Sequence, residues 1–103
     1  MKRYAFAMQL KPGFAAEYKK RHDEIWPEIK NLLKETGISD YSIFLNEETH
    51  TLFAVQYVAG GSSQDLGNNP IVQKWWDYMA DIMVTNQDNS PVSVPLKEVF
   101  HLS

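Results

Sequence analysis

The chain has no cysteine, which excludes disulfide frameworks, thiolate nucleophiles and cysteine-based metal sites. It also has no long apolar run. The residues Met1–Tyr4 lead directly into an alternating pattern, so we expect neither a signal peptide nor a membrane span. Positive charge is scarce: the net charge is −3, and helical spacing spreads the short run Lys19–Arg21 around a cylinder. Nucleic acids and anionic membranes are therefore poor partners, and a cytoplasmic location is the default expectation.

Several catalytic signatures are missing as well. The sequence has no glycine-rich phosphate loop, no H-x-x-x-H pair and no grouping of carboxylates beyond scattered surface pairs. The sequence thus lacks the motifs typical of metal sites, nucleotide sites and covalent catalysis, so we expect no metal and no cofactor. The chemistry that these absences leave is proton transfer to a small neutral polyol.

Aromatic residues are abundant by contrast. They make up 13% of the 103 residues and include five Tyr and three Trp. The remaining composition, 44% hydrophobic and 22% charged, is that of an ordinary globular protein. The length fits one domain over residues 1–103, with no repeats or linkers.

Hydrophobic periodicity predicts four strands and two helical regions. The region Ala59–Asn69 is rich in Gly, Ser and Asn, and we expect it to form a mobile loop or a short helical turn. The resulting order is β-α-β-β-α-β, a ferredoxin-like split arrangement of the α+β class with helices over one face of an antiparallel sheet. The predicted elements are strand Arg3–Leu10, helix Phe14–Ile25, helical segment Pro27–Thr36, strands Asp40–Leu45 and His50–Val58, helix Pro70–Met83, and a strand from Val92 or Val94 to Leu102.

The first helical region carries a histidine on its apolar face. Trp26-Pro27 interrupts the helix, which places His22 in the last turn, where the helix dipole favours its charged form. A histidine in such a position is often a core residue bonded to a carbonyl. Here Tyr, His and Trp gather beside a proline break, which favours a cavity that binds a polar molecule. The apolar face consists of Phe14, Tyr18, His22, Ile25, Ile29 and Leu32.

The second helix adds two more aromatic side chains. Trp75 lies on its apolar side and Trp76 flanks that side. If Tyr18 and His22 point at the sheet near Tyr41, and Trp75 or Trp76 approaches from the second helix, these residues enclose one small pocket. Aromatic faces pack against the C–H side of a sugar, and polar tips bond to its hydroxyls. A histidine with an ordinary pKa of about 6.5 exchanges protons near neutrality.

Four motifs, in order and at matching separations, extend this interpretation. The motifs are M-Q-L-K-P at Met8–Pro12, Y-K-K-R-H-D-E-I-W-P-E at Tyr18–Glu28, W-W-D-Y-M-A-D-I-M at Trp75–Met83, and N-Q-D-N-S-P-V-S with L-K-E-V-F-H-L between Asn86 and Leu102. With these motifs the chain resembles the L-rhamnose mutarotase family over nearly its whole length, and only Ala59–Asn69 matches nothing in that pattern.

The resemblance implies a dimeric α/β-barrel enzyme that interconverts the α and β anomers of L-rhamnose. Its implied proton donor is His22, and its implied sugar contacts are Tyr18, Tyr41, Trp75 and Trp76. A homodimer also follows from the residues, because the sheet face without helices is apolar and needs cover. The catalytic base stays open between a tyrosine, Asp88, a backbone carbonyl and a bound water.

Two other functions remain compatible with the same frame. One is a haem-linked or oxygenase-type enzyme with His22 as an axial ligand, which a Soret band would reveal. The other is a non-catalytic sugar-binding module, which would bind rhamnose without accelerating exchange between its anomers. The fold alone does not choose among these functions.

Overall fold

The computed structural model describes residues 2–103. Its elements follow the predicted order, with the first crossover divided into two helices. The elements are β1 (Lys2–Gln9), α1 (Ala15–Asp23), α2 (Pro27–Glu35), β2 (Ile38–Asn46), β3 (Thr51–Val58), a short 3-10 helix η1 (Ser63–Asp65), α3 (Pro70–Met79) and β4 (Ser93–Leu96).

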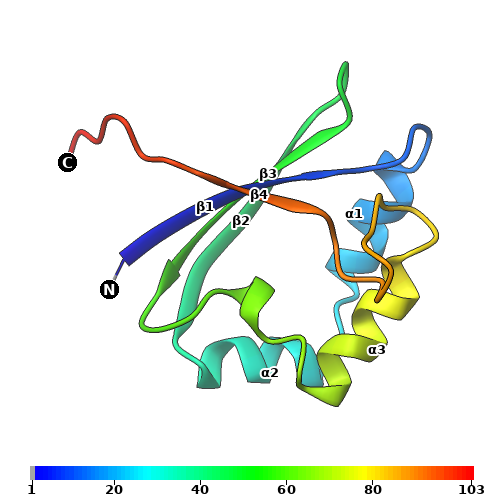
Figure 1. The fold of residues 1–103 in the computed structure, drawn as a ribbon, viewed down its shortest axis with the longest axis horizontal. Coiled ribbons are helices and arrows are strands. Elements are labelled where there is room, and N and C mark those ends of the chain that lie inside the picture. The colour runs from blue at the N-terminus through cyan, green and yellow to red at the C-terminus, as the bar shows by residue number, and fades with distance from the viewer. Residues whose placement is uncertain (1) are drawn as a thin grey trace.

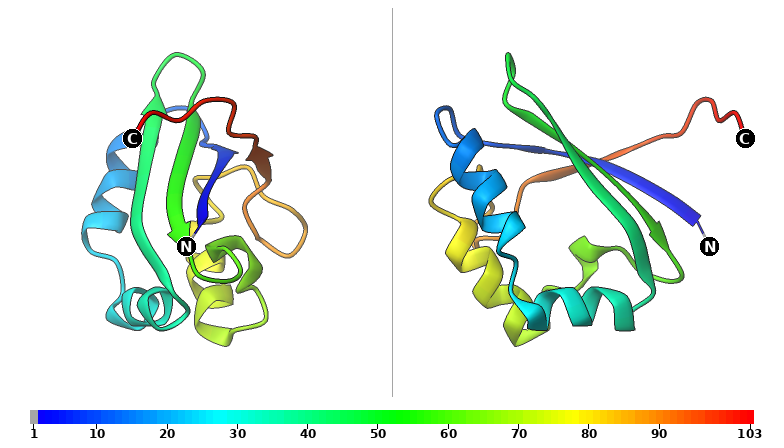
Figure 2. Two further views of the ribbon diagram at one scale, coloured as in Figure 1. Left: turned by 90° about the vertical axis from the view of Figure 1, so that its left-hand side faces the viewer. Right: turned by 180° about the vertical axis from the view of Figure 1, so that it is seen from behind.

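The four strands form one antiparallel sheet in the order β2-β3-β1-β4. All three α-helices lie on one side of this sheet (Figure 1), and the view from behind shows no helix on the other side (Figure 2). The predicted α+β class and the split β-α-β-β-α-β order are therefore confirmed. This arrangement gives every strand one helix-covered face and one bare face.

The core lies between the sheet and the helices because strand residues alternate between the two faces. Phe6 and Met8 of β1 are buried and stand opposite Ala54 and Leu52 of β3. Burial of a side chain such as Phe6 stabilises the fold by about 1.5–3 kcal/mol. One alternating set of residues on each of these two strands thus builds the core.

The proline break between α1 and α2 is also confirmed. Trp26 has an extended backbone, with ψ 134°, and Pro27 occupies the first turn of α2. The predicted bounds of α1, Phe14–Ile25, were too wide. Phe14 caps the helix and is partly exposed rather than packed in the apolar stripe, because the chain still turns from Gly13 at this point.

Two other predicted ends were too long. The helix α3 stops at Met79 instead of Met83, and the following turn pairs Met83 with Leu10, which buries Met83 without helical structure. The last strand covers only Ser93–Leu96, where it pairs with Ala5–Met8 of β1. The residues after Leu96 run away from the body of the protein (Figure 1), and Phe100 is 77% exposed.

The glycine-rich region contains the short helical turn that was one of the two expectations for it. Ser62 caps this turn: its hydroxyl accepts a hydrogen bond from the Gln64 N–H, and Asp65 accepts one from the Ser62 N–H. Gly67 then packs directly on Trp76, since a Cβ at Gly67 would lie 2.8 Å from the indole. The region is therefore anchored against α3.

Candidate active site

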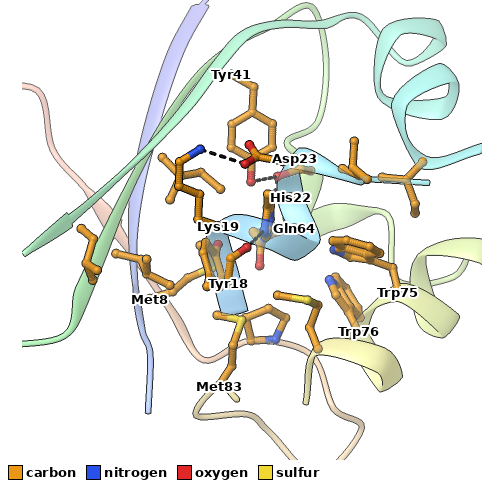
Figure 3. A pocket seen from close by; sticks show the side chains of 18 of the residues that line it. Met8, Tyr18, Lys19, His22, Asp23, Tyr41, Gln64, Trp75, Trp76 and Met83 are labelled. Atoms are coloured by element: carbon orange, nitrogen blue, oxygen red, sulfur yellow. Dashed lines mark hydrogen bonds and ion pairs between the residues drawn. The ribbon is translucent and has the colours of Figure 1, made fainter. Parts of the chain in front are cut away.

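A cavity of about 880 Å³ lies between the helices and the covered face of the sheet. Volumes up to about 1,000 Å³ are typical of small-molecule sites. Figure 3 shows side chains from α1, α3, the sheet and the loop Ala59–Asn69, which contains η1 and is called the η1 loop below, around one space. All five residues singled out in the sequence line this cavity, namely Tyr18, His22, Tyr41, Trp75 and Trp76.

Tyr18 and His22 are one helical turn apart and lie against each other. Their rings stack with centroids 4.2 Å apart, at an angle of 28°. The edge of Trp75 completes the arrangement, with its ring centroid 5.5 Å from that of His22 and nearly perpendicular to it. The imidazole is thus held by two aromatic side chains from two helices, which restricts its orientation.

A backbone bond fixes the tautomer of His22. Its Nδ1 lies 3.1 Å from the carbonyl oxygen of Tyr18. A carbonyl can only accept, so Nδ1 carries the proton and Nε2 of the neutral ring has a free lone pair. The carbonyl bond that a core histidine would make is therefore present, but the ring also lines the cavity.

The pKa of His22 is lowered from its ordinary value. Burial is the main cause, and the bond to the Tyr18 carbonyl and the charge of Asp23 oppose it. The expected preference of the helix end for the charged form is thus present in these opposing contributions, but burial has the larger effect on the pKa. Desolvation lowers the pKa by more than the helix end raises it, because the imidazole is packed between Tyr18 and Trp75.

The two tryptophans are both buried but have different neighbours. Trp75 contacts His22, and it meets Trp26 edge-on with ring centroids 5.1 Å apart. Trp76 instead lies under the η1 loop, against Gly67. The two adjacent positions thus divide between an aromatic cluster and a loop contact, in agreement with the prediction that they do not face the same way.

The wall of α1 is held in place by Arg21. Its guanidinium donates to both oxygens of Asp81, at 2.9 and 3.2 Å, and to the backbone carbonyl of Tyr78. It also donates to Glu17 on its own helix. Because this side chain is largely buried, the bidentate bond fixes α1 relative to the end of α3.

A model of the L-rhamnose mutarotase family matches residues 3–102. The chain belongs to this family. It is 67% identical over 103 residues to the L-rhamnose mutarotase of Bacteroides thetaiotaomicron and 63% identical to that of Formosa agariphila, with 99% of each chain covered. The crystal structure of an L-rhamnose mutarotase from Formosa agariphila superposes with a TM-score of 0.94, at 59% identity and full coverage of both chains. The resemblance stated from the four motifs is therefore confirmed.

In this family member, Tyr41 lies directly after an irregularity in β2. The pairing with β3 shifts between Ser39 and Ser42, and Asp40 takes a left-handed backbone with φ 46°. From Tyr41 onward the strand alternates regularly, and Tyr41, Ile43 and Leu45 are the less exposed set. The hydroxyl of Tyr41 lies 3.5 Å from that of Ser63. Burial raises the pKa of Tyr41, and the hydrogen bond from Ser63 partly offsets this effect.

The sequence-based interpretation missed the contribution of the η1 loop. Ser63, Gln64 and Leu66 all line the cavity, and Figure 3 shows Gln64 among the side chains around it. One signal was present: Gln56 interrupts an apolar face formed by Leu52, Ala54 and Val58, and a buried amide requires partners. Those partners are in the loop, at Ser63.

Tyr18 offers the cavity an uncommitted hydroxyl. Tyr18 is buried, with 8% of its surface exposed. Even so, within residues 2–103 no hydrogen bond joins its hydroxyl to the protein. Burial and the nearby Tyr41 raise its pKa well above the ordinary value, so the phenol stays protonated at neutral pH. Tyr18 can therefore donate to, or accept from, a ligand in the cavity.

Proposed function

We propose that this chain is an L-rhamnose mutarotase and that His22 is the residue that carries the proton. The observation that supports this role most strongly is the geometry of the imidazole. It lines the cavity, is stacked on Tyr18, and holds its Nδ1 proton on a backbone carbonyl, which leaves Nε2 as the exchanging atom.

Anomer exchange requires two proton movements. A base takes the proton of the anomeric hydroxyl while the bond between the anomeric carbon and the ring oxygen breaks, and an acid protonates the ring oxygen. The open aldehyde rotates about one bond, and the same steps in reverse close the ring on its other face. Each positioned proton transfer contributes about 10²–10⁴-fold to the rate.

The lowered pKa of His22 means that the neutral ring dominates at neutral pH. We propose that Nε2 first takes the anomeric proton and then, as imidazolium, donates it to the ring oxygen. Both oxygens are bonded to the anomeric carbon, so one imidazole can serve them in turn. This route balances the protons and requires no separate carboxylate base.

We assign the sugar contacts to the residues around His22. Trp75 and Trp76 supply apolar surface for the C–H side of the ring, while the hydroxyls of Tyr18 and Tyr41 bond to sugar hydroxyls. A neutral sugar offers no charge, so the rate comes from positioning and proton transfer. These roles agree with the burial of both indoles and with the polar tips that line the cavity.

We further propose that the protein is a single-domain homodimer that forms a dimeric α/β barrel through the bare sheet face. Phe44, Phe53, Ala7 and Val94 form one apolar row across that face, each paired with the next in the strand register. Phe44 is 62% exposed and Val94 56%. Two such faces packed on each other about a two-fold axis would cover this row. Sedimentation that shows a stable 11.9 kDa monomer at micromolar concentration would refute the dimer.

The protein's proposed place of action is the cytoplasm. No helix within residues 2–103 has the length and apolar character needed to cross a bilayer. Fractionation of cells that express the chain, followed by detection in the cytosolic fraction, tests this location, and recovery with secreted proteins would refute it.

The activity itself is tested by saturation-transfer NMR on free aldoses at equilibrium. We expect catalytic amounts of the protein to accelerate exchange between the two anomers of L-rhamnose, with weaker effects on sugars that differ in their hydroxyl pattern. Binding without acceleration would identify a non-catalytic sugar-binding module. Absence of both effects would refute the proposed function.

A further inference from the structure

A buried amide lies behind the cavity, on the covered face of β3. Gln56 has no exposed surface, and both of its polar atoms contact Ser63 in the η1 loop. Its Oε1 lies 2.9 Å from the Ser63 N–H, and its Nε2 lies 3.0 Å from the Ser63 hydroxyl. This two-point contact is the deepest anchor of the loop.

The contact fixes which way the amide points. The Ser63 backbone N–H can only donate, so the atom that faces it must be the carbonyl oxygen of Gln56. The other atom is then the NH₂ group, which can only donate to the Ser63 hydroxyl oxygen. The hydrogen-bond partners therefore determine which atom of the Gln56 amide is oxygen and which is nitrogen.

The direction of the next bond follows by the same accounting. A hydroxyl has two acceptor positions and one proton. The NH₂ groups of Gln56 and Gln64, at 3.0 and 3.4 Å, occupy the acceptor positions of Ser63. Its single proton therefore points to the Tyr41 hydroxyl oxygen at 3.5 Å. Tyr41 accepts this bond, and its own phenolic proton is left for the cavity.

We propose that Gln56 is a positioning residue that, through Ser63, orients the Tyr41 hydroxyl as a hydrogen-bond donor to the sugar. This inference rests on the proposed function, and specifically on the contact between Tyr41 and the sugar. Gln56 does not reach the cavity itself. Its effect is to hold the η1 loop closed and to set the direction of the chain of bonds from β3 to the ligand.

The test is a double-mutant cycle on anomer exchange, with kcat and KM measured for each protein. Gln56→Met keeps the length of the side chain and removes both bonds. In the parent background we expect kcat/KM to fall by about three- to tenfold, which corresponds to the loss of one or two hydrogen bonds. In a Tyr41→Phe background the same substitution should change kcat/KM by less than about twofold, because the hydroxyl that it orients is absent.

The matched control is Gln73→Met. Gln73 is also an amide with two bonds, to Asp77 and to the carbonyl of Asp88, but it lies outside the cavity lining. We expect Gln73→Met to leave kcat/KM unchanged relative to each background, parent or Tyr41→Phe. Amide exchange provides a second measurement: Gln56→Met should deprotect the Ser63 N–H, whereas Gln73→Met should not.

An equal loss in both backgrounds would show that Gln56 is merely structural and would overturn the inference, as would no loss in the parent background. If Gln56→Met does not fold, Ser63→Ala decides by the same cycle, since it keeps the backbone bond to Gln56 and removes only the hydroxyl. A parent chain that does not exchange rhamnose anomers would refute the proposed function instead, so the two failures are distinguishable.

Discussion

The two faces of the sheet are built from the same strands but differ in shape and polarity. The covered face curves around a cavity and presents Tyr41 from β2, while Gln56 of β3 braces the loop above it. The bare face presents a row that includes Phe44, Phe53 and Val94, with exposed apolar side chains. Every residue on one face has a sequence neighbour on the other, so a single alternation produced both surfaces.

The difference shows what each surface can recognise. A small polar ligand needs enclosure and directional bonds, which the covered face supplies through hydroxyls and one imidazole. An exposed apolar row fits another apolar surface, and a second copy of the chain is the occupant that symmetry favours. Substitutions on one face should therefore leave the function of the other intact.

The largest expected effect is on assembly. Phe53→Glu would place a charge in the centre of each copy of the bare face, and we expect the proposed dimer to separate into monomers while the cavity keeps its activity per chain. Analytical ultracentrifugation and anomer exchange on the same sample measure both properties. A variant that remains dimeric would place the interface elsewhere.

The next effect is on stability, and it compares the two tryptophans. Trp75→Ala removes the ring that contacts His22, Trp26 and Tyr78, and we expect the free energy of unfolding to fall by about 3–5 kcal/mol. Trp76→Phe keeps an aromatic ring under the loop, so it should cost less than about 1.5 kcal/mol and mainly weaken sugar binding. Chemical denaturation of both variants tests this ranking, which equal losses would contradict.

A smaller effect is expected from Tyr18→Phe. The Tyr18 hydroxyl faces the cavity, so its removal leaves no buried partner unpaired, and stability should change by less than about 1 kcal/mol. We expect kcat/KM to fall by about three- to tenfold through one lost bond to the sugar. The matched control is Tyr57→Phe on the bare face, where the hydroxyl accepts from Arg3 and the residue lies outside the cavity lining. An equal loss of activity in both variants would remove the distinction between the faces.

The smallest expected effect is the change of kcat/KM with pH near neutrality. Because burial lowers the pKa of His22, the neutral ring is the majority form at pH 7. If the neutral ring takes the first proton, kcat/KM should rise with pH through this lowered pKa and level off before pH 7. The pH profile of the parent measures this. A kcat/KM that falls as pH rises through the same range would mean that imidazolium is required from the start.

The sequence predicted the α+β class, the proline break and the five cavity residues because each depends on local spacing. The turn period placed Tyr18 and His22 on one side of α1, and two-residue alternation placed Tyr41 on the covered face. The ends of α3 and β4 were wrong because they depend on partners distant in sequence, such as Leu10 and β1. The roles of Ser63 and Gln64 depend on how an unpatterned loop folds over the sheet, which no periodicity encodes.

The most direct test of the account is the exchange rate of His22→Asn. Asparagine keeps a polar side chain of similar reach but cannot exchange a proton near neutrality. Saturation-transfer NMR on L-rhamnose should show a rate at least about 100-fold below the parent, approaching the background of the free sugar, with the melting temperature and the oligomeric state of the parent. A folded His22→Asn protein that exchanges anomers at the parent rate would contradict the assignment of the proton to His22.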